Sequence, residues 1–382
     1  MSSSVIVIGG GISGTAAAWE LARHGVSVTL LERGDLASMA SGWTLAGVRQ
    51  SGRHPAELPL AKAAIRRWET LDNELNQDIE YRQHGNLRLA LTPNDVPAIQ
   101  QVVADANAAG IAATWLDGAD AVHEVAPALT SNLVGASFCP TDGHANPQLT
   151  VLAFAEAARR AGAEIRTGVE VLGIETDGRR VTGVKTTMET IFAERVIVAA
   201  GVYAPRLLDP LGIHIPFTIV VVPGIQTQPL EPMLDQVLGI PSGGFAGRQQ
   251  ADGRFRITGS STPWTATDHN ADNVMPTLGQ VGNVVAWSTR LIPALAQIRA
   301  TRIWGGLIDK TPDALPVIEA TPEVEGLVVA AGFSGHGFCL GPVTGEILAD
   351  LATEGVTRHP IGPFARARLD EVTEAEAVTL HG

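Results

Sequence analysis

The hydrophobic pattern at the start of the chain predicts a strand, a helix and a second strand. Residues 5–8 form a β-branched run, and residues 13–24 place apolar side chains at helical spacing. Gly25 is suited to end this helix, and residues 26–31 are typical of a buried strand. The pattern therefore predicts a β-α-β unit of about thirty residues.

The rest of the chain carries further helix and strand patterns. Helices are expected at residues 60–75, 94–109, 150–161, 281–291 and 344–351. Strands are expected at residues 86–91, 164–166, 169–174, 181–186, 195–199 and 326–331, whereas residues 34–56 and 332–337 are predicted to be loops. The alternating stretches 217–222 and 254–258 predict an antiparallel sheet.

This order of elements predicts two domains, one of which is discontinuous. Residues 1–80, 145–210 and 302–382 share the α/β character of the opening segment. Residues 81–144 and 211–301 interrupt them and contain the antiparallel signals. We therefore expect an α/β fold with a second, mainly antiparallel domain of α+β type.

Composition and charge exclude several classes of function. The 27 Lys and Arg against 40 Asp and Glu give a net charge of −13, and no long basic cluster offsets it, which disfavours nucleic-acid binding. Cys139 and Cys339 are too few for a four-thiolate metal or iron–sulfur site, so no metal is expected. The chain shows no secretory signal, and its apolar stretches are shorter than the roughly 20 residues of a membrane span. A cytoplasmic location is expected.

The sharpest local signal is a G-x-G-x-x-G turn placed between the first strand and the first helix. It reads Gly9-Gly10-Gly11-Ile12-Ser13-Gly14, and such glycines permit a tight turn, approach of a pyrophosphate and close helix–strand packing. Glu32 follows the second strand, where its carboxylate can accept hydrogen bonds from ribose hydroxyls and would repel a 2′-phosphate. The segment therefore predicts a dinucleotide site, disfavours NADP and leaves FAD and NAD open.

Three later segments give the chain a family resemblance. They are Ala37-Ser38-Met39-Ala40-Ser41-Gly42, Val196-Ile197-Val198-Ala199-Ala200-Gly201-Val202-Tyr203 and Ala331-Gly332-Phe333-Ser334-Gly335-His336-Gly337-Phe338. With the first glycine turn, they resemble the D-amino-acid-oxidase-like FAD oxidoreductases, particularly sarcosine oxidases, glycine oxidase and the β subunits of proline, hydroxyproline and opine dehydrogenases. Residues 139–147 and 304–313 add to a resemblance that runs from residue 5 to about 351. It implies a Rossmann-like FAD-binding domain and a separate substrate domain.

The resemblance also assigns residues to the cofactor. The first turn would bind the pyrophosphate, Glu32 and Arg33 the adenosine ribose, Val169 the adenine, and the last glycine segment the isoalloxazine edge, where a helix N-terminus stabilises negative charge. The full set is Gly9, Gly11, Ile12, Ser13, Gly14, Glu32, Arg33, Ser41, Gly42, Val169, Ala200, Gly201, Tyr203, Gly332, Phe333, Ser334, Gly335, His336, Gly337 and Phe338.

The chain departs from two branches of this family. Cys339 stands where monomeric sarcosine oxidase has a lysine near the flavin, and the flavin-linking cysteine of that enzyme is missing near residues 304–306. Ile308 stands where glycine oxidase has an arginine for the substrate carboxylate. FAD is therefore expected to bind non-covalently, and the dehydrogenase β subunits are the better relatives.

The implied reaction is oxidation of a secondary or N-substituted amino acid, such as sarcosine, proline, hydroxyproline or an opine, to an imine by hydride transfer to flavin N5. The departures favour an electron acceptor other than oxygen, either a quinone or a partner subunit that carries the relay. A glycine or D-amino-acid oxidase that uses oxygen directly, a non-catalytic flavin-binding subunit and an NAD-dependent dehydrogenase stay open as alternatives.

Two residues are candidates for direct work on the substrate. A guanidinium suits the carboxylate because it binds bidentately. The resemblance implies Arg49 as the first candidate, because it lies in the loop after Ser41 and Gly42 where sarcosine oxidases carry a carboxylate-binding arginine, with an exposed loop arginine as the alternative. Arg256 and Arg302 are weaker candidates. His336 would hydrogen-bond the flavin or the substrate, with packing as the alternative. Structural roles are favoured for His144, Asp309 and Asp313, and either pocket or core positions are open for Trp43, Trp264 and Trp304.

Overall fold

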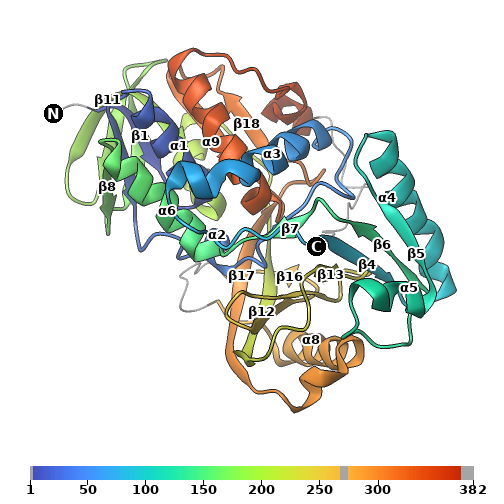
Figure 1. Cartoon of the computed structure of the whole chain (residues 1–382). Helices are drawn as coiled ribbons and strands as arrows, with labels where there is room; N and C mark the ends of the chain where they lie inside the picture. Colours follow the sequence, from blue (N-terminus) through green and yellow to red (C-terminus); the bar gives the residue numbers. More distant parts are fainter. Residues whose placement is uncertain (1–2, 267–273, 371–382) are drawn as a thin grey trace.

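The computed structural model describes residues 3–266 and 274–370, which form two sheets with helices around them (Figure 1). In the first sheet the strand order is β18 (Val317–Ala320), β19 (Leu327–Ala331), β11 (Thr190–Val198), β1 (Ser3–Ile8), β2 (Val28–Glu32) and β8 (Glu164–Thr167). Its strands are parallel except at the β18–β19 pair. An antiparallel extension leads from β11 through β10 (Val181–Thr186) to β9 (Val171–Thr176).

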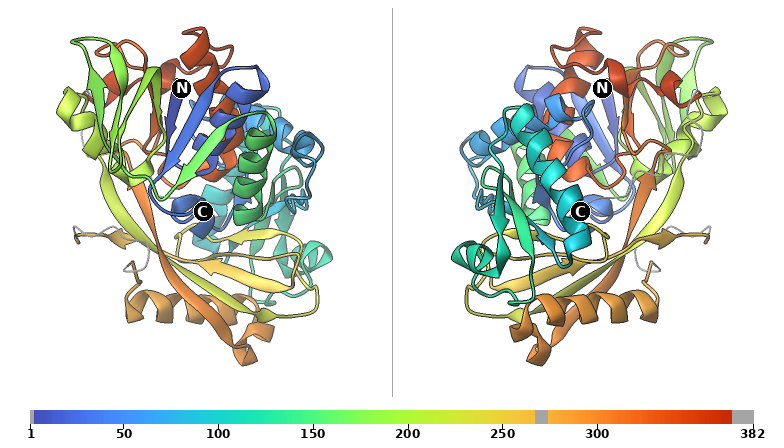
Figure 2. Two further views of the ribbon diagram at one scale, coloured as in Figure 1. Left: turned by 90° about the vertical axis from the view of Figure 1, so that its left-hand side faces the viewer. Right: turned by 90° about the vertical axis from the view of Figure 1, so that its right-hand side faces the viewer.

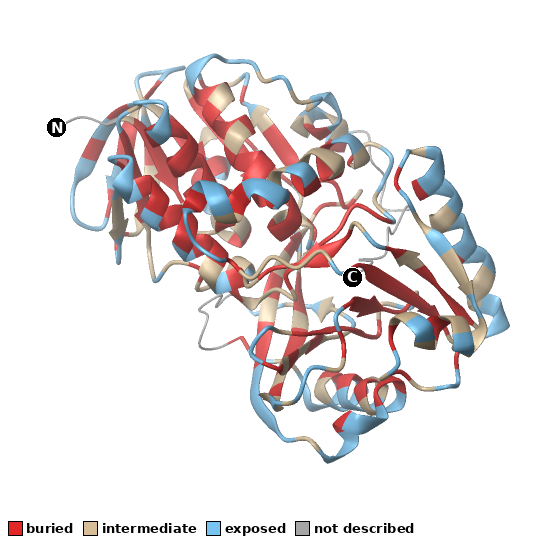
Figure 3. Cartoon of the chain, viewed as in Figure 1, coloured by how far each residue is buried: buried red, intermediate tan, exposed pale blue. Residues whose placement is uncertain are grey.

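Both faces of the first sheet are covered, because successive side chains of a strand point to opposite faces. Val5 and Val7 of β1 enter a core with helices α1 (Ile12–Arg23), α3 (Leu58–Leu75), α6 (Pro147–Arg160) and α9 (Gly337–Thr353). Ile6 and Ile8 enter a second core with the antiparallel extension and α7 (Ala204–Leu208). Figure 3 shows this half of the molecule as its most completely buried part.

The second sheet is antiparallel except at one pair. Its order is β16 (Thr262–Pro263), β12 (Thr218–Pro229), β15 (Arg254–Thr258), β14 (Ala246–Gln249), β13 (Val237–Gly239), β4 (Asn86–Ala90), β6 (Gly135–Cys139) and β5 (Thr114–Asp117). β17 (Ala300–Lys310) pairs with β12, and these two long strands run from beside the first sheet into the second (Figure 2). The parallel pair is β13–β4.

Three helices lie beside this second sheet: α4 (Val96–Ala108), α5 (Gly118–Val125) and α8 (Leu278–Leu291). Thr277 caps α8 by accepting a hydrogen bond from the Gln280 amide, and Val284 and Leu291 of this helix enter the core of the second sheet. The helix expected at residues 281–291 is therefore present and begins slightly earlier.

Two expectations for local structure need correction. The sequence pattern predicts the last helix at residues 344–351, yet α9 begins at Gly337 and includes Pro342, although proline and glycine both disfavour helix. Thirteen of the 17 residues of α9 are buried, so tertiary packing outweighs the weak local propensity. The loop expected at 34–56 contains a short helix, α2 (Ala40–Trp43), and β3 (Gly47–Val48), which pairs with β7 (Gly143–His144).

The sheets separate along the chain much as the domain pattern suggested. Strands of the first sheet fall within residues 1–80, 145–210 and 302–382, but β17 belongs to the second sheet although most of it lies after residue 302. The domain boundaries and the cytoplasmic location stay predictions. Across residues 3–266 and 274–370, the structure contains no helix with the length and apolar character that crossing a membrane requires.

Candidate functional site

Two adjoining cavities lie where the first sheet meets β12 and β17. The large cavity has a volume of about 420 Å³ and the small cavity about 160 Å³. Residues that line both connect them: Gly11, Ala40, Ser41, Ala199, Gly201, Leu307 and Asp309. The arrangement is long enough to receive an extended ligand with its two ends in different surroundings.

The first glycine turn forms the wall between the two cavities. Gly9 has a φ of +115°, and a Cβ on it would lie 2.3 Å from the carbonyl oxygen of Ala199. A Cβ on Gly14 would lie 2.0 Å from the carbonyl oxygen of Gly9. Side chains are therefore excluded at both positions, which leaves the backbone of β1, the turn and α1 close together.

The small cavity contains the predicted adenosine end. Glu32 accepts hydrogen bonds from the amides of Gly10 at 2.7 Å and Gly34 at 2.8 Å, which orient its carboxylate. The guanidinium of Arg33 lies 3.9 Å from the centre of the Tyr203 ring. The predicted cofactor residues that line this cavity are Gly9, Gly11, Glu32, Arg33, Ser41, Val169, Ala200, Gly201 and Tyr203.

The C-terminal glycine segment lines the large cavity. Asp309, at the end of β17, accepts a hydrogen bond from the Gly332 amide at 2.7 Å, and its carbonyl accepts one from the Ser334 amide. Burial raises the pKa of Asp309 to about 6. The predicted residues in this cavity are Gly11, Ile12, Ser13, Ser41, Gly201, Phe333, Ser334, Gly335, His336, Gly337 and Phe338. The two glycine-rich segments thus share one cavity although they lie at opposite ends of the chain.

Three predicted cofactor residues support the walls instead of lining them. Gly14 packs against Gly9, and Gly332 is held by Asp309. A Cβ on Gly42 would lie 1.8 Å from the carbonyl oxygen of Ala37, so a side chain is excluded there too. These glycines act on the site through the backbone path that they permit.

Arg49 lies in a buried polar group beside the cavities and is not among their described lining residues. Its guanidinium donates to the carbonyl oxygen of Ser51 at 2.9 Å. Asp142, which is fully buried, accepts hydrogen bonds from the amides of Gln50 and Ser51. Burial, with the charges of Arg88 and Arg53, lowers the pKa of Arg49. Its role in binding the substrate carboxylate stays a prediction.

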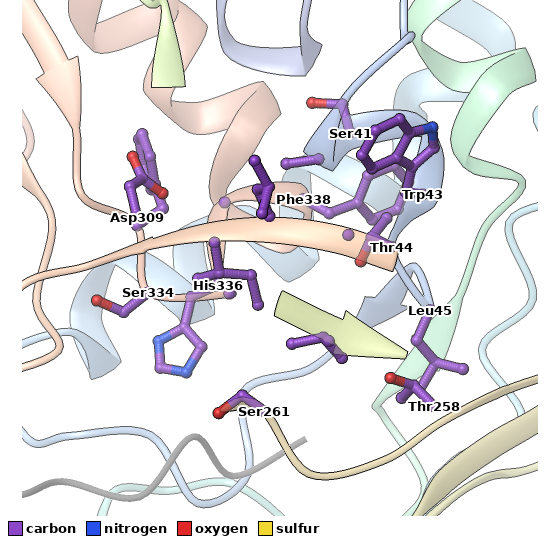
Figure 4. Close-up of a pocket in the computed structure, with 18 of the residues that line it drawn as sticks. Ser41, Trp43, Thr44, Leu45, Thr258, Ser261, Asp309, Ser334, His336 and Phe338 are labelled. Atoms are coloured by element: carbon purple, nitrogen blue, oxygen red, sulfur yellow. The ribbon is translucent and has the colours of Figure 1, made fainter. Parts of the chain in front are cut away.

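His336 and Ser261 both line the large cavity, and Figure 4 draws them among its lining side chains. Its Nδ1 lies 3.0 Å from a carboxylate oxygen of Glu57, which is the residue that precedes α3. Burial lowers the pKa of His336. Burial of Glu57 is outweighed by His336 and Arg53, which hold the pKa of its carboxyl at about 2. The pair therefore consists of a neutral imidazole and an ionised carboxylate at neutral pH.

The second sheet supplies the opposite wall of the large cavity. Thr258 of β15 and Ser261 of the following loop line it (Figure 4), as does Trp304 of β17. Trp43 at the end of α2 and Thr44 after it also line this cavity (Figure 4). Lys310, at the end of β17, is the one lysine or arginine among its described lining residues.

The remaining arginines and His144 have other positions. Arg256 donates to backbone carbonyls of residues 42 and 44, and Arg302 is exposed. His144 is buried with its Nδ1 3.0 Å from an Arg248 nitrogen, and burial lowers its pKa well below the usual range. Trp264 packs against a small apolar cluster that includes Val221 and Leu307.

Sequence patterns did not indicate Glu57, Lys310 or the placement of Asp309 in both cavities. Glu57 follows a polar stretch and resembles an exposed helix start, so only its burial reveals its role. Asp309 was interpreted as a turn residue, but it ends a strand and is 8% exposed. The signal that identifies Asp309 as a site residue is a buried carboxyl with a raised pKa, and both the burial and the pKa depend on tertiary contacts.

The geometry fits a flavin dinucleotide. Any Cβ at Gly9 or Gly14 would fill the space that the glycine turn leaves open. Glu32 lines the small cavity, and the large cavity beyond the turn has room for a ring system. FAD would extend from Glu32 past Gly11 and Ser41 to the segment ending at Phe338.

Comparisons with known proteins agree with this fit. Residues 4–351 match the family model described as FAD dependent oxidoreductase (DAO). The chain is 30% identical to sarcosine oxidase subunit beta of an Arthrobacter species, over 97% of this chain and 91% of that protein. It is 28% identical to glycine oxidase of Geobacillus kaustophilus, over 95% of this chain and 96% of that protein.

Solved structures give the same result. L-proline dehydrogenase from P. horikoshii superposes with a TM-score of 0.89 at 29% identity, covering 97% of this chain and 98% of that one. Glycine oxidase from G. kaustophilus superposes with a TM-score of 0.88 at 28% identity, covering 96% of this chain and 99% of that one. The predicted combination of a Rossmann-like cofactor domain and an antiparallel second domain is confirmed. The chain belongs to the DAO family of FAD-dependent oxidoreductases.

Proposed function

We propose that this enzyme oxidises the C–N bond of a secondary or N-substituted amino acid to an imine, which water then hydrolyses. The observation that carries the proposal is the large cavity, where the C-terminal glycine segment at the flavin end faces a separate wall from the second sheet. Relatives named for sarcosine and L-proline support the substrate class.

When bound, FAD accepts the hydride that leaves the α-carbon of the amine. The protein has to position the amine and keep its nitrogen unprotonated, because the lone pair drives formation of the C=N bond. His336 is placed for this task. Its Nδ1 is occupied by Glu57, so its Nε2 is left to accept a hydrogen bond or proton from the substrate nitrogen.

A carboxylate on the substrate needs a cation in or next to the large cavity. Lys310 lines that cavity, and Arg49 lies in the buried polar group beside it. Both are proposed as candidates for this contact, Arg49 through its bidentate guanidinium and Lys310 through its position.

We propose further that the electron acceptor is a quinone or a partner subunit carrying a relay, with FAD bound non-covalently. The similarity to sarcosine oxidase β subunits supports a partner, and Ile308 and Cys339 separate the chain from the simple oxidases. Release of FAD by acid precipitation would test the binding mode. Flavin left on the precipitated protein would contradict it.

A panel of amines tested under argon separates the proposed reaction from its alternatives. At least one of sarcosine, L-proline, hydroxyproline and an opine should bleach the flavin, whereas glycine and D-alanine should not. Bleaching by glycine alone would favour primary-amine oxidation, which the similarity to glycine oxidase supports. Bleaching by none would favour a non-catalytic flavin subunit. Rapid reoxidation of the bleached enzyme by air alone would contradict the dehydrogenase form.

A further inference from the structure

The segment 42–45, which leaves the short helix α2, is bound along its backbone by side chains of the second sheet. Arg256 of β15 donates to the carbonyl oxygens of Gly42 at 2.7 Å and Thr44 at 2.6 Å. One guanidinium thus binds two carbonyls that are two residues apart. The contact spans more than 200 residues of sequence, so it is made only in the folded chain.

The carbonyl oxygens of Trp43 and Leu45, which alternate along the chain with those of Gly42 and Thr44, also accept hydrogen bonds from side chains of the second sheet. Trp304 Nε1 of β17 donates to the carbonyl oxygen of Trp43 at 3.0 Å, and Arg248 Nε of β14 donates to that of Leu45 at 2.6 Å. Arg248 also donates to the carbonyl oxygen of Ala145 at 2.9 Å. Four consecutive carbonyls are therefore satisfied by three side chains of the second sheet.

Because α2 ends at Trp43, the end of this helix explains why the carbonyls of Gly42 and Trp43 need partners. The last four carbonyls of a helix have no acceptor role within the helix, and a buried carbonyl without a donor is costly. The amides of Gly42, Trp43 and Thr44 are already bound to carbonyls of Met39 and Ala40. The second sheet therefore completes the hydrogen bonding of a helix that belongs to the first domain.

Burial makes these contacts strong and specific. Arg248 is 2% exposed, and burial lowers the pKa of its guanidinium to about 9 and that of Arg256 to about 10, so both are charged at neutral pH. Arg256 also lies 4.7 Å from the centre of the Trp304 ring. Two nitrogens of Arg256 donate to backbone carbonyls, and Arg256 is not among the described residues that line the large cavity; both observations argue against its binding the substrate carboxylate.

The bound segment continues into the cofactor turn. Ser41, at its start, accepts a hydrogen bond from the amide of Ile12 at 3.0 Å, and Ile12 is the first residue of α1. Ser41 lines both cavities, and Trp43, Thr44 and Leu45 line the large one. The path from Arg256 through residues 41–45 to the glycine turn is unbroken.

We propose that Arg256, Arg248 and Trp304 are positioning residues that hold residues 41–45 against the FAD site, so that the second domain sets the affinity for the flavin part of the cofactor. This inference rests on FAD binding and does not depend on which amine is oxidised.

Titration of the apo-protein with FAD and with AMP tests the proposal. AMP reaches only the small cavity, which Glu32 and Val169 line and residues 42–45 do not. Arg256→Met keeps the aliphatic contact but loses both carbonyl donors, so the Kd for FAD should rise at least about tenfold while the Kd for AMP stays within about twofold. In Arg256→Lys a single ammonium group replaces the two-pronged guanidinium, so the Kd for FAD should rise less than in Arg256→Met.

Arg254→Met is the matched control, because Arg254 lies two residues away on β15 and pairs with Asp252 at the surface. It should bind FAD as the natural chain does. Trp304→Phe removes a single N–H donor and provides a second test if Arg256→Met fails to fold. Unchanged FAD affinity in the Arg256 and Trp304 variants would overturn the proposal. An equal loss of FAD and AMP affinity would also overturn it, because that result indicates a general loss of structure.

Discussion

His336 Nδ1 and a carboxylate oxygen of Glu57 lie 3.0 Å apart, although 279 residues separate them in sequence. Glu57 is completely buried, and the charge of its carboxylate fixes which nitrogen of His336 carries the proton. Nε2 is then left as the acceptor of this ring, and His336 lines the large cavity. In the proposed reaction Glu57 is therefore a positioning residue for His336.

Glu57→Gln should reduce turnover while FAD stays bound. An amide supports the imidazole through a weaker hydrogen bond and does not stabilise its charged form, so proton acceptance should fall by about tenfold or more. Because Glu57 raises the pKa of His336, the acid limb of kcat/KM should also move to lower pH. The control is Glu69→Gln on the same helix, which is exposed. An unchanged pH profile in Glu57→Gln would remove the pair from the mechanism.

The natural enzyme should itself lose activity in acid. Burial lowers the pKa of His336, so the neutral form persists at pH 6.5 and above, and kcat/KM should fall only as the pH drops through that lowered value. The measurement is kcat/KM against pH with a substrate whose own ionisation is known. A decline that begins above pH 6.5 would assign the limb to another group.

Asp309→Asn should stabilise the apo-protein at neutral pH and not in acid. The pKa of Asp309 is about 6 in the folded chain against an ordinary 3.8, so its protonated form stabilises the fold below pH 3.8 and that contribution is lost as pH rises through 6. About two pKa units correspond to roughly 3 kcal/mol. Urea unfolding at pH 4 and pH 7.5 measures the difference. Equal effects at both values would contradict the buried, protonated carboxyl.

Two glycine-to-alanine substitutions should have opposite effects on stability. A Cβ on Gly345 of α9 would lie 2.4 Å from the Ala16 Cβ and 2.7 Å from its backbone, so Gly345→Ala should force α1 and α9 apart and destabilise the fold by about 1–3 kcal/mol. Gly282 of α8 has nothing within 4 Å, so Gly282→Ala should stabilise by roughly 0.5–1 kcal/mol. Thermal unfolding of both apo-proteins checks the signs. Stabilisation by Gly345→Ala would show that the helices are not in contact.

The two candidate cations for the substrate carboxylate can be separated with a pair of substrates. If a residue binds the carboxylate, changing it to Met should weaken the enzyme's binding of the amino acid by roughly 2–5 kcal/mol. Binding of the matching amine that lacks the carboxylate should not change. Arg49→Met and Lys310→Met are compared in this way through kcat/KM. Equal losses on both substrates would indicate a structural role for that residue.

The first β-α-β unit could be predicted because its signals are local. Gly9, Gly14 and Glu32 act within one turn and two strands, and the structure places them together as the spacing implied. The start of α9 could not be predicted in this way. Its weak local propensity is overcome by burial against Ile12 and Ala16, residues more than 300 positions earlier.

The role of Arg256 shows the same division in the site. As a strand arginine it was a candidate for the substrate carboxylate, because that role suits its chemistry. The carbonyl oxygens of Gly42 and Thr44 occupy it instead, and only the folded chain brings them within reach.

The chain by itself therefore predicted most of the elements and a dinucleotide site, since short-range spacing of glycines, apolar residues and one carboxylate is sufficient for these, and the resemblance of its later motifs to a family implied FAD. Tertiary structure alone decided which ionisable groups are buried and what they contact. It converts Glu57 into a partner of His336, raises the pKa of Asp309 and brings Arg256 of the second sheet onto the carbonyl oxygen of Gly42. Burial and long-range contact set these properties, and neither is encoded in any local stretch of sequence.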